Sequence, residues 1–239
     1  MPTVQTIAEN LAEVRSRIDA AARRAGRSPA DITLVAVSKT FDAECVRAAW
    51  EAGHRDFGEN KVQEAERKIA ATAGLTGARW HLIGHLQSNK ARKAAPAFSV
   101  IHSVDSLDLL KRLDSAAAEA GAEQQILLQT DLAGEETKHG AAEQDITTLA
   151  HAALEARAVK LAGLMLLPPW NENQEVTRPW FVRVRELRDR LLGAGIPAAA
   201  LRHLSMGMSH DFEAAVEEGA TMVRVGTAIF GKRTTATSL

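Results

Sequence analysis

The feature that most constrains this chain is a regular alternation of short apolar runs with longer amphipathic segments. Eight strand candidates follow one another at 32–39, 55–60, 80–84, 100–105, 125–131, 161–168, 203–209 and 222–227, and the first is rich in β-branched residues. A segment with helical spacing follows each run. Eight strands, each followed by a helix, predict an α/β fold, a single (β/α)8 barrel over residues 1–239. A doubly wound open sheet also alternates, and it is the alternative.

An extra helix is expected before the first strand. Ile7, Leu11, Val14 and Ile18 share one face of the segment 4–25, which Gly26 ends. The other helices are expected at 43–52, 61–72, 106–121, 142–156, 174–192 and 212–218, with short ones from Ser88 and Ala228. No Pro/Gly/Ser-rich linker divides the chain, which favours one domain.

Composition excludes several classes of protein. A quarter of the 239 residues are charged, 46% are apolar and the net charge is −1, so the chain has no cationic field for nucleic acid. The single cysteine, Cys45, excludes an intramolecular disulfide and a cysteine-based zinc site.

There is no run of ~20 apolar residues for a membrane helix, and the N-terminus does not resemble a signal peptide. We therefore expect a cytoplasmic protein with no nucleic-acid or membrane partner. No cluster of metal-ligand spacing is evident, so no metal is expected.

Lys39 is the strongest candidate for a reactive side chain. Period-two alternation places it on the same face as Val35 and Val37, at the end of the first strand. Reactive groups of a barrel gather at the carboxyl ends of its strands. A lysine sheltered there has a lowered pKa and is able to attack an aldehyde. The alternative is a lysine that merely begins a solvated loop.

The last strand supplies a second candidate. Met222, Arg224 and Gly226 share its predicted inner face, and Thr227 follows. An inward arginine needs an acceptor, and the backbone after strands seven and eight of a barrel often binds phosphate. A structural arginine paired with a neighbouring carboxylate is the alternative. One ligand would match both candidates: a lysine that reacts with an aldehyde, and an arginine beside a phosphate-binding site. That ligand is pyridoxal 5′-phosphate (PLP), an aromatic aldehyde that carries a phosphate.

Five motifs in order now carry a family resemblance: LVAVSKT at 34–40, FGENKVQE at 57–64, WHLIGHLQSNK at 80–90, LSMGMSHDFEAA at 204–215 and MVRVGTAIFG at 222–231. Together they resemble the YggS/PROSC family of pyridoxal phosphate homeostasis proteins, over nearly the whole chain. The family is similar to the N-terminal barrel of bacterial alanine racemase, a fold type III PLP protein, without that enzyme's second, β-rich domain.

The resemblance implies a cofactor site of seven residues: Lys39, Asn60, His81, Ser205, Arg224, Gly226 and Thr227. Lys39 would hold PLP covalently as a Schiff base, and Arg224 would face the pyridine nitrogen. Ser205, Gly226 and Thr227 would hold the phosphate, and the other two would line the pocket. No role is assigned to His85, His210, Lys90 or Lys138, and Trp170 is expected to be a packing residue.

Three functions remain open at this point. An arginine does not give up its proton, so a pyridine ring facing it is a weak electron sink. Racemisation needs acid/base groups on both faces of the substrate carbon, and the tyrosine that alanine racemases use is missing because the chain has none. The first hypothesis is therefore a monomeric PLP carrier without robust catalysis, which serves vitamin B6 homeostasis and PLP-dependent apoenzymes. The alternatives are a PLP-dependent amino acid racemase and a cofactor-free class I aldolase.

Overall fold

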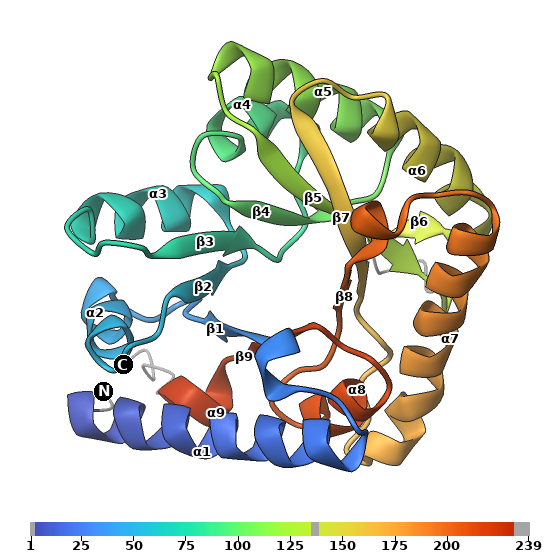
Figure 1. Ribbon diagram of the computed structural model, residues 1–239. Helices are drawn as coiled ribbons and strands as arrows, with labels where there is room; N and C mark the ends of the chain where they lie inside the picture. Colours follow the sequence, from blue (N-terminus) through green and yellow to red (C-terminus); the bar gives the residue numbers. More distant parts are fainter. Residues whose placement is uncertain (1–2, 135–138, 232–239) are drawn as a thin grey trace, which may run out of the picture.

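Eight parallel strands close into a barrel in the computed structural model, which describes residues 3–134 and 139–231 (Figure 1). The barrel strands are β1 (Thr33–Val37), β2 (Asp56–Glu59), β3 (Arg79–Leu82), β4 (Val100–Val104), β5 (Gln124–Asp131), β7 (Val159–Leu166), β8 (His203–Ser205) and β9 (Met222–Val225). β1 pairs with both β2 and β9, and β4 pairs with β5, so the ring has no open edge. The predicted barrel is confirmed, and the open sheet is excluded.

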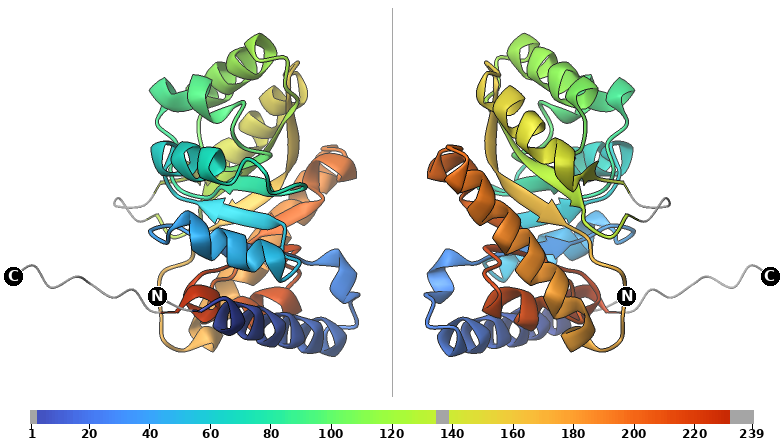
Figure 2. Two further views of the ribbon diagram at one scale, coloured as in Figure 1. Left: turned by 90° about the vertical axis from the view of Figure 1, so that its left-hand side faces the viewer. Right: turned by 90° about the vertical axis from the view of Figure 1, so that its right-hand side faces the viewer.

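Helices surround the barrel, as Figures 1 and 2 show from three sides. They are α1 (Val4–Arg24), α2 (Ala43–Glu51), α3 (Val62–Ala71), α4 (Ala91–Ala94), α5 (Leu107–Glu119), α6 (Ile146–Leu154), α7 (Gln174–Gly193), α8 (Phe212–Glu217) and α9 (Thr227–Phe230). Short 3-10 turns precede β1, α4, α6 and β8 at Pro29–Asp31, Ser88–Lys90, Glu143–Asp145 and Ala198–Leu201. A two-residue strand, β6 (Ala141–Ala142), which the sequence did not predict, pairs with the end of β5.

The predicted extra helix is α1, and it joins the first part of the chain to the last. Its apolar stripe, Ile7, Leu11, Val14 and Ile18, is buried, and the helix packs on α2, α8 and α9 (Figure 1). Asn10 Nδ2 donates a hydrogen bond of 2.8 Å to the carbonyl oxygen of Ile229 in α9. Helix α1 therefore supports the element that follows the last strand.

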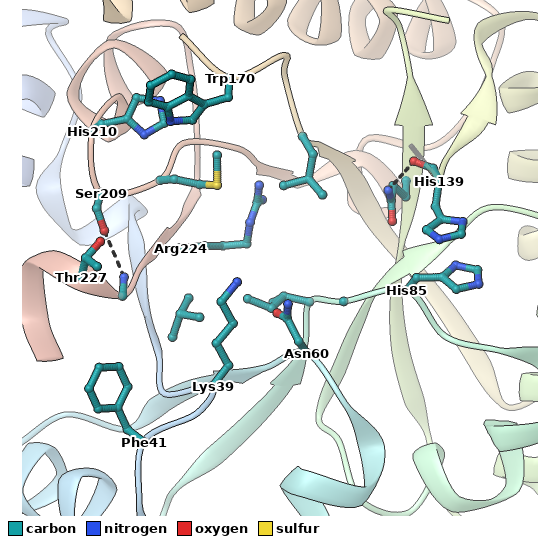
Figure 3. A pocket seen from close by; sticks show the side chains of 17 residues that line it. Lys39, Phe41, Asn60, His85, His139, Trp170, Ser209, His210, Arg224 and Thr227 are labelled. Atoms are coloured by element: carbon teal, nitrogen blue, oxygen red, sulfur yellow. Dashed lines mark hydrogen bonds between the residues drawn. The ribbon is translucent and has the colours of Figure 1, made fainter. Parts of the chain in front are cut away.

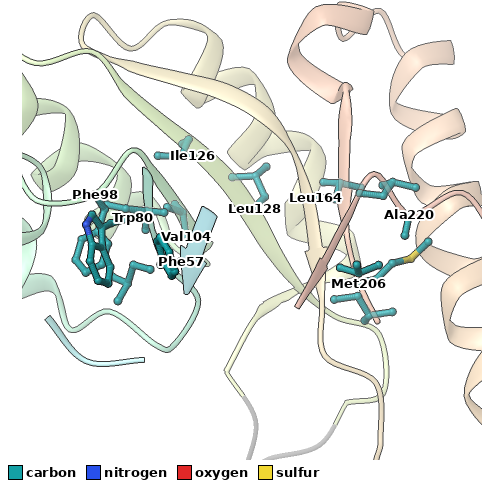
Figure 4. Packing of buried hydrophobic residues seen from close by; sticks show 14 of the residues in the cluster. Phe57, Trp80, Phe98, Val104, Ile126, Leu128, Leu164, Met206 and Ala220 are labelled. Atoms are coloured by element: carbon teal, nitrogen blue, oxygen red, sulfur yellow. The ribbon is translucent and has the colours of Figure 1, made fainter. Parts of the chain in front are cut away.

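Alternate residues of each strand face the helices or the barrel interior. Leu34 and Ala36 of β1, with Val223 and Val225 of β9, belong to the large apolar layer between strands and helices, part of which is drawn in Figure 4. A second, small apolar cluster fills part of the interior: Val100, Leu127, Ala162, Met165 and Met222. The predicted inner face of the last strand is therefore confirmed.

Several predicted strands end earlier than expected. The run 203–209 is a strand only at His203–Ser205, because Gly207 adopts a φ of 90° and takes the chain out of the sheet. The run 222–227 likewise ends at Val225, and α9 begins at Thr227. The residues that follow these two strands, Ser209 and Thr227 among them, consequently lie beyond the sheet at the carboxyl end of the barrel.

Within residues 3–134 and 139–231, none of the helices has the length and apolar character that crossing a membrane requires.

Candidate functional site

A pocket of about 660 Å³ opens at the carboxyl end of the barrel (Figure 3). Its lining includes five of the seven predicted site residues: Lys39, Asn60, Arg224, Gly226 and Thr227. They come from the ends of β1, β2 and β9, so the barrel geometry brings together residues far apart in the sequence. The volume is typical of a site for a small organic ligand.

The residues on both sides of Lys39 are held by carboxylates. Ser38 Oγ donates to Glu59 Oε1 at 2.6 Å, and the Thr40 amide donates to Glu64 Oε1 at 2.5 Å. Thr40 has a φ of 68°, a left-handed conformation that is unusual for a β-branched residue. These contacts fix where Lys39, which is half-buried, enters the pocket.

A buried lysine holds those two carboxylates in place. Lys68 Nζ lies 2.7 Å from Glu59 Oε1 and 2.8 Å from Glu64 Oε1, and it donates to the Ser38 carbonyl oxygen at 2.6 Å. Burial raises the pKa of Glu59, and the hydrogen bond from Lys68 works in the opposite direction. The loop that carries Lys39 thus rests on an ion-pair network between β2 and α3.

Arg224 is a buried cation whose guanidinium lines the pocket. Its side chain donates to Ser205 Oγ at 2.6 Å and to the carbonyl oxygen of Leu166 at 2.8 Å. Burial lowers the pKa of Arg224 to about 10, so it remains charged at neutral pH. Among the described residues no carboxylate lies within ion-pair distance of it. The structure therefore does not support the alternative of a structural arginine in contact with a neighbouring carboxylate, and the buried Asp211 acts on Arg224 only electrostatically, without an ion pair.

Backbone amides and hydroxyls gather on the side of the pocket formed by α9. Ser209 Oγ accepts from the Gly226 amide at 3.2 Å and from the Ala228 amide at 3.5 Å (Figure 3). Thr227 adds a second hydroxyl to the pocket wall. Amide donors and hydroxyls in such an arrangement suit an anionic group.

The other two predicted site residues, His81 and Ser205, do not line the pocket. Ser205 is fully buried and accepts the hydrogen bond from Arg224. His81 is also buried, and its two ring nitrogens contact His102 and Asp56. Both predicted residues therefore lie beneath the pocket, within reach of a ligand only through Arg224.

The structure adds pocket residues that sequence reasoning left without a role or missed. His85, His139, His210 and Gln129 all contribute to the lining. Trp170, expected to be a packing residue, lines the rim and is 68% exposed, so that prediction is wrong. Its position in a loop directly after Pro168 and Pro169 was the available signal. Lys138 lies outside the described residues.

His85, Asp105 and His139 form a cluster that their separation in the sequence conceals. One ligand atom from each lies within 4.8 Å of the others, a spacing compatible with a metal ion. The two imidazole rings, however, stack in parallel, with centroids 3.6 Å apart and planes at 10°. In-plane nitrogen lone pairs of stacked rings do not converge on one point, so a shared ion would require a ring to turn. The expectation that the protein holds no metal stays a prediction.

Comparisons with known proteins show the family to which the chain belongs. Residues 9–234 match the family described as alanine racemase, N-terminal domain. The chain is 46% identical over 230 residues to the pyridoxal phosphate homeostasis protein of Pseudomonas aeruginosa, covering 96% of this chain and 97% of that protein. It is 43% identical over 225 residues to the protein of the same name from Aquifex aeolicus, covering 94% and 97%.

Solved structures extend the likeness to three dimensions. PipY of Synechococcus elongatus, solved with PLP bound, has 41% identity and a TM-score of 0.84, over 94% of this chain and all of that one. Alanine racemase of Streptomyces coelicolor, at 22% identity and a TM-score of 0.70, shares the fold over 96% of this chain and 59% of the enzyme. With matches over nearly its whole length, the chain belongs to the family of pyridoxal phosphate homeostasis proteins, whose barrel is that of the alanine racemase N-terminal domain.

Proposed function

We propose that this protein binds PLP in the pocket at the barrel mouth and holds it for vitamin B6 homeostasis. The observation that carries the proposal is the pairing of Lys39 with Arg224, a buried cation without a carboxylate partner among the described residues, in one pocket of about 660 Å³. The relatives named as pyridoxal phosphate homeostasis proteins, and the PLP-bound PipY, support the choice of ligand.

The chemistry assigned to Lys39 is a reversible condensation. With PLP bound, the Lys39 amine would supply the nitrogen for a Schiff base with the aldehyde, a condensation that releases the carbonyl oxygen as water. The reverse reaction with water releases the aldehyde unchanged. A carrier needs this reversibility, because the same bond that retains the ligand must open for delivery.

The other pocket residues orient the ligand. Arg224 would donate a hydrogen bond to the pyridine nitrogen and keep its own proton. The hydroxyls of Ser209 and Thr227 would hold the phosphate beside the Gly226 backbone. Asn60 would border the ring, and Gly84 lets the two backbones approach closely, since a Cβ on Gly84 would lie 2.4 Å from the Asn60 carbonyl oxygen.

The presence of Arg224 favours a protein that binds PLP over an enzyme that uses it for catalysis. A pyridine nitrogen that stays unprotonated withdraws electrons weakly, so carbanions on a bound amino acid are poorly stabilised. We therefore propose a monomeric carrier in the cytoplasm that passes PLP to apoenzymes, with no robust catalysis of its own. Racemisation of alanine is the alternative, and the chirality of L-alanine incubated with the loaded protein measures it directly.

The proposal is tested by an absorption spectrum between 300 and 500 nm after incubation with PLP. We expect a Schiff-base band that borohydride converts into a stable adduct, found by peptide mapping on the peptide with Lys39. Lys39→Ala removes the band, whereas Lys111→Ala, which changes an exposed lysine of α5, leaves it in place. A Lys39→Ala protein with an unchanged band would contradict the proposal.

A further inference from the structure

Five polar side chains form a continuous hydrogen-bonded chain inside the barrel, which we call the histidine chain. Arg224 donates to Ser205 Oγ at 2.6 Å, and Ser205 Oγ lies 2.9 Å from His102 Nδ1. His102 Nε2 lies 3.0 Å from His81 Nδ1, and His81 Nε2 lies 3.0 Å from Asp56 Oδ1. The chain therefore runs from the pocket down to Asp56, the first residue of β2, at the opposite end of the barrel.

The two ends of the histidine chain have fixed roles. A guanidinium only donates hydrogen bonds, so Ser205 must accept from Arg224. At the other end Asp56 also accepts from Arg79, at 2.7 Å. Burial disfavours the charge on Asp56, but hydrogen bonds from His81 and Arg79 hold the pKa of this carboxyl below its usual value. Asp56 is thus an ionised acceptor at neutral pH.

Charge balance sets the protonation of the two histidines between these ends. Burial lowers the pKa of His102 well below its ordinary value, so this ring is neutral. His81 is 2% exposed, and the carboxylate that it contacts among the described residues, Asp56, is also paired with Arg79. A second buried cation at His81, in a barrel that already holds Arg224, would have to share that carboxylate. A neutral His81 avoids this and has, like His102, one donor and one acceptor nitrogen.

We infer that His81 is neutral, that every hydrogen bond of the histidine chain points the same way, from Arg224 to Asp56, and that His102 and Asp56 are positioning residues for Arg224. Asp56 requires the proton of His81 on Nε2, which leaves Nδ1 as an acceptor. His102 must then donate from its own Nε2 and accept on Nδ1 from the Ser205 hydroxyl. The hydroxyl is thereby turned away from the pocket, and its lone pairs face Arg224.

With this assignment, the buried residues of the histidine chain contribute to ligand binding by orienting Arg224. Because the Ser205 hydroxyl donates its one hydrogen bond to His102, it can only accept from Arg224. This contact fixes the plane of the guanidinium. The remaining donors of Arg224 then face the pocket in one orientation. The role in binding rests on the proposed function, since the ligand that Arg224 meets there is PLP, whereas the direction of the hydrogen bonds does not depend on any ligand.

The direction is tested on the full-length protein without ligand by ¹⁵N NMR of its histidine side chains at pH 7.5. We expect His81 and His102 each to show a protonated Nε2 and a bare Nδ1. A protonated Nδ1 on either ring, as an imidazolium at His81 would produce, overturns the inference. A failure to bind PLP would leave this result unaffected and would refute only the proposed function.

The positioning role is tested with two variants of His102. His102→Leu removes both nitrogens, and we expect about a tenfold rise in the Kd for PLP. His102→Gln keeps one acceptor and one donor, and we expect it to restore most of the affinity. The matched control is His54→Leu, because His54 is also buried at the Asp56 end of the barrel, but its ring nitrogens contact the Asp56 backbone carbonyl and Arg15 rather than a side chain of the histidine chain.

Unfolding in urea, measured on all three variants, separates stability from binding. The inference predicts that His54→Leu and His102→Leu both lose stability, while only His102→Leu loses affinity. An unchanged Kd in His102→Leu, or an equal loss of affinity in His54→Leu, would show that His102 has a structural role only.

Discussion

At the residue scale, the environment of Arg224 matters most for the proposed binding. Alternation along the last strand already placed this side chain inside the barrel, and the structure adds that Ser205 and Leu166 hold it there. A buried guanidinium held by two neutral acceptors keeps its full charge for a ligand. A hydroxyl on the pocket wall, such as that of Thr227, contributes one neutral hydrogen bond at most.

The relative contributions of Arg224 and Thr227 to PLP affinity can be predicted. Arg224→Ala is expected to weaken PLP retention more than Thr227→Ala, by about ten- to a hundredfold against a few-fold, because it removes a charge rather than one hydroxyl. Equilibrium titration of both variants measures the dissociation constants, with urea unfolding as the control for folding. Equal constants, or the reverse order, would contradict the assignment of Arg224.

The limits of sequence reasoning are also clearest at single residues. Lys39 was predictable because it ends an apolar strand on its inner face. His102 was not, because it lies within the apolar-looking segment VIHSV, and its contact with Ser205 joins β4 to β8 across the barrel. The family resemblance placed Ser205 beside the phosphate, and the sequence does not show that its hydroxyl accepts a hydrogen bond from Arg224.

At the scale of elements, the turn after β8 positions one wall of the pocket. Gly207 has a φ of 90°, and a Cβ there would lie 2.6 Å from the Ala215 Cβ and 2.9 Å from the Phe212 Cα. Strand propensity extended the predicted strand through this residue because periodicity alone does not reveal a left-handed backbone. The turn brings Met208, Ser209 and His210 to the pocket.

Gly207→Ala is therefore expected to destabilise the protein by about 2 kcal/mol or more and to weaken PLP binding through the displaced Ser209. The matched control is Gly193→Ala at the end of α7, where an added Cβ meets no atom within 4 Å. Chemical denaturation and PLP titration of the pair measure both effects. Equal behaviour of the two variants would show that the turn tolerates a side chain.

The ion-pair network below Lys39 leads to a pH-dependent prediction. Lys68→Met leaves Glu59 buried without its cation and should cost about 3–5 kcal/mol at pH 8. Burial raises the pKa of Glu59, and losing Lys68 raises it further, so the folded state binds more protons than the unfolded state. Stability of the variant then falls as pH rises from the unfolded to the folded pKa.

The loss of stability in Lys68→Met, measured against wild type, should consequently shrink between pH 8 and pH 5, as Glu59 becomes protonated. Urea unfolding at the two pH values measures it, with Lys111→Met as the control on an exposed lysine. A deficit that is the same at both pH values would refute the account of the network.

At the scale of the whole molecule, the count of strand and helix units was enough to predict the barrel. Each unit carries a local periodic signal, and a ring of eight is a standard closure for such units. Local signals do not define which residues meet across the ring. Five of the predicted site residues line the pocket, and His81 and Ser205 lie outside its lining. The monomeric state stays a prediction, which light scattering of the purified protein would measure.

The exposed indole at the rim of the pocket has a practical consequence. Trp170 stands in solvent beside the space that a chromophoric aldehyde would occupy, with its ring centroid 6.1 Å from that of His210. Light emitted by an indole overlaps the absorption of such a chromophore, so arrival and departure of the cargo should dim and restore the fluorescence of Trp170. The protein thus carries its own optical reporter of loading, which allows delivery to an apoenzyme to be followed in real time without an attached dye.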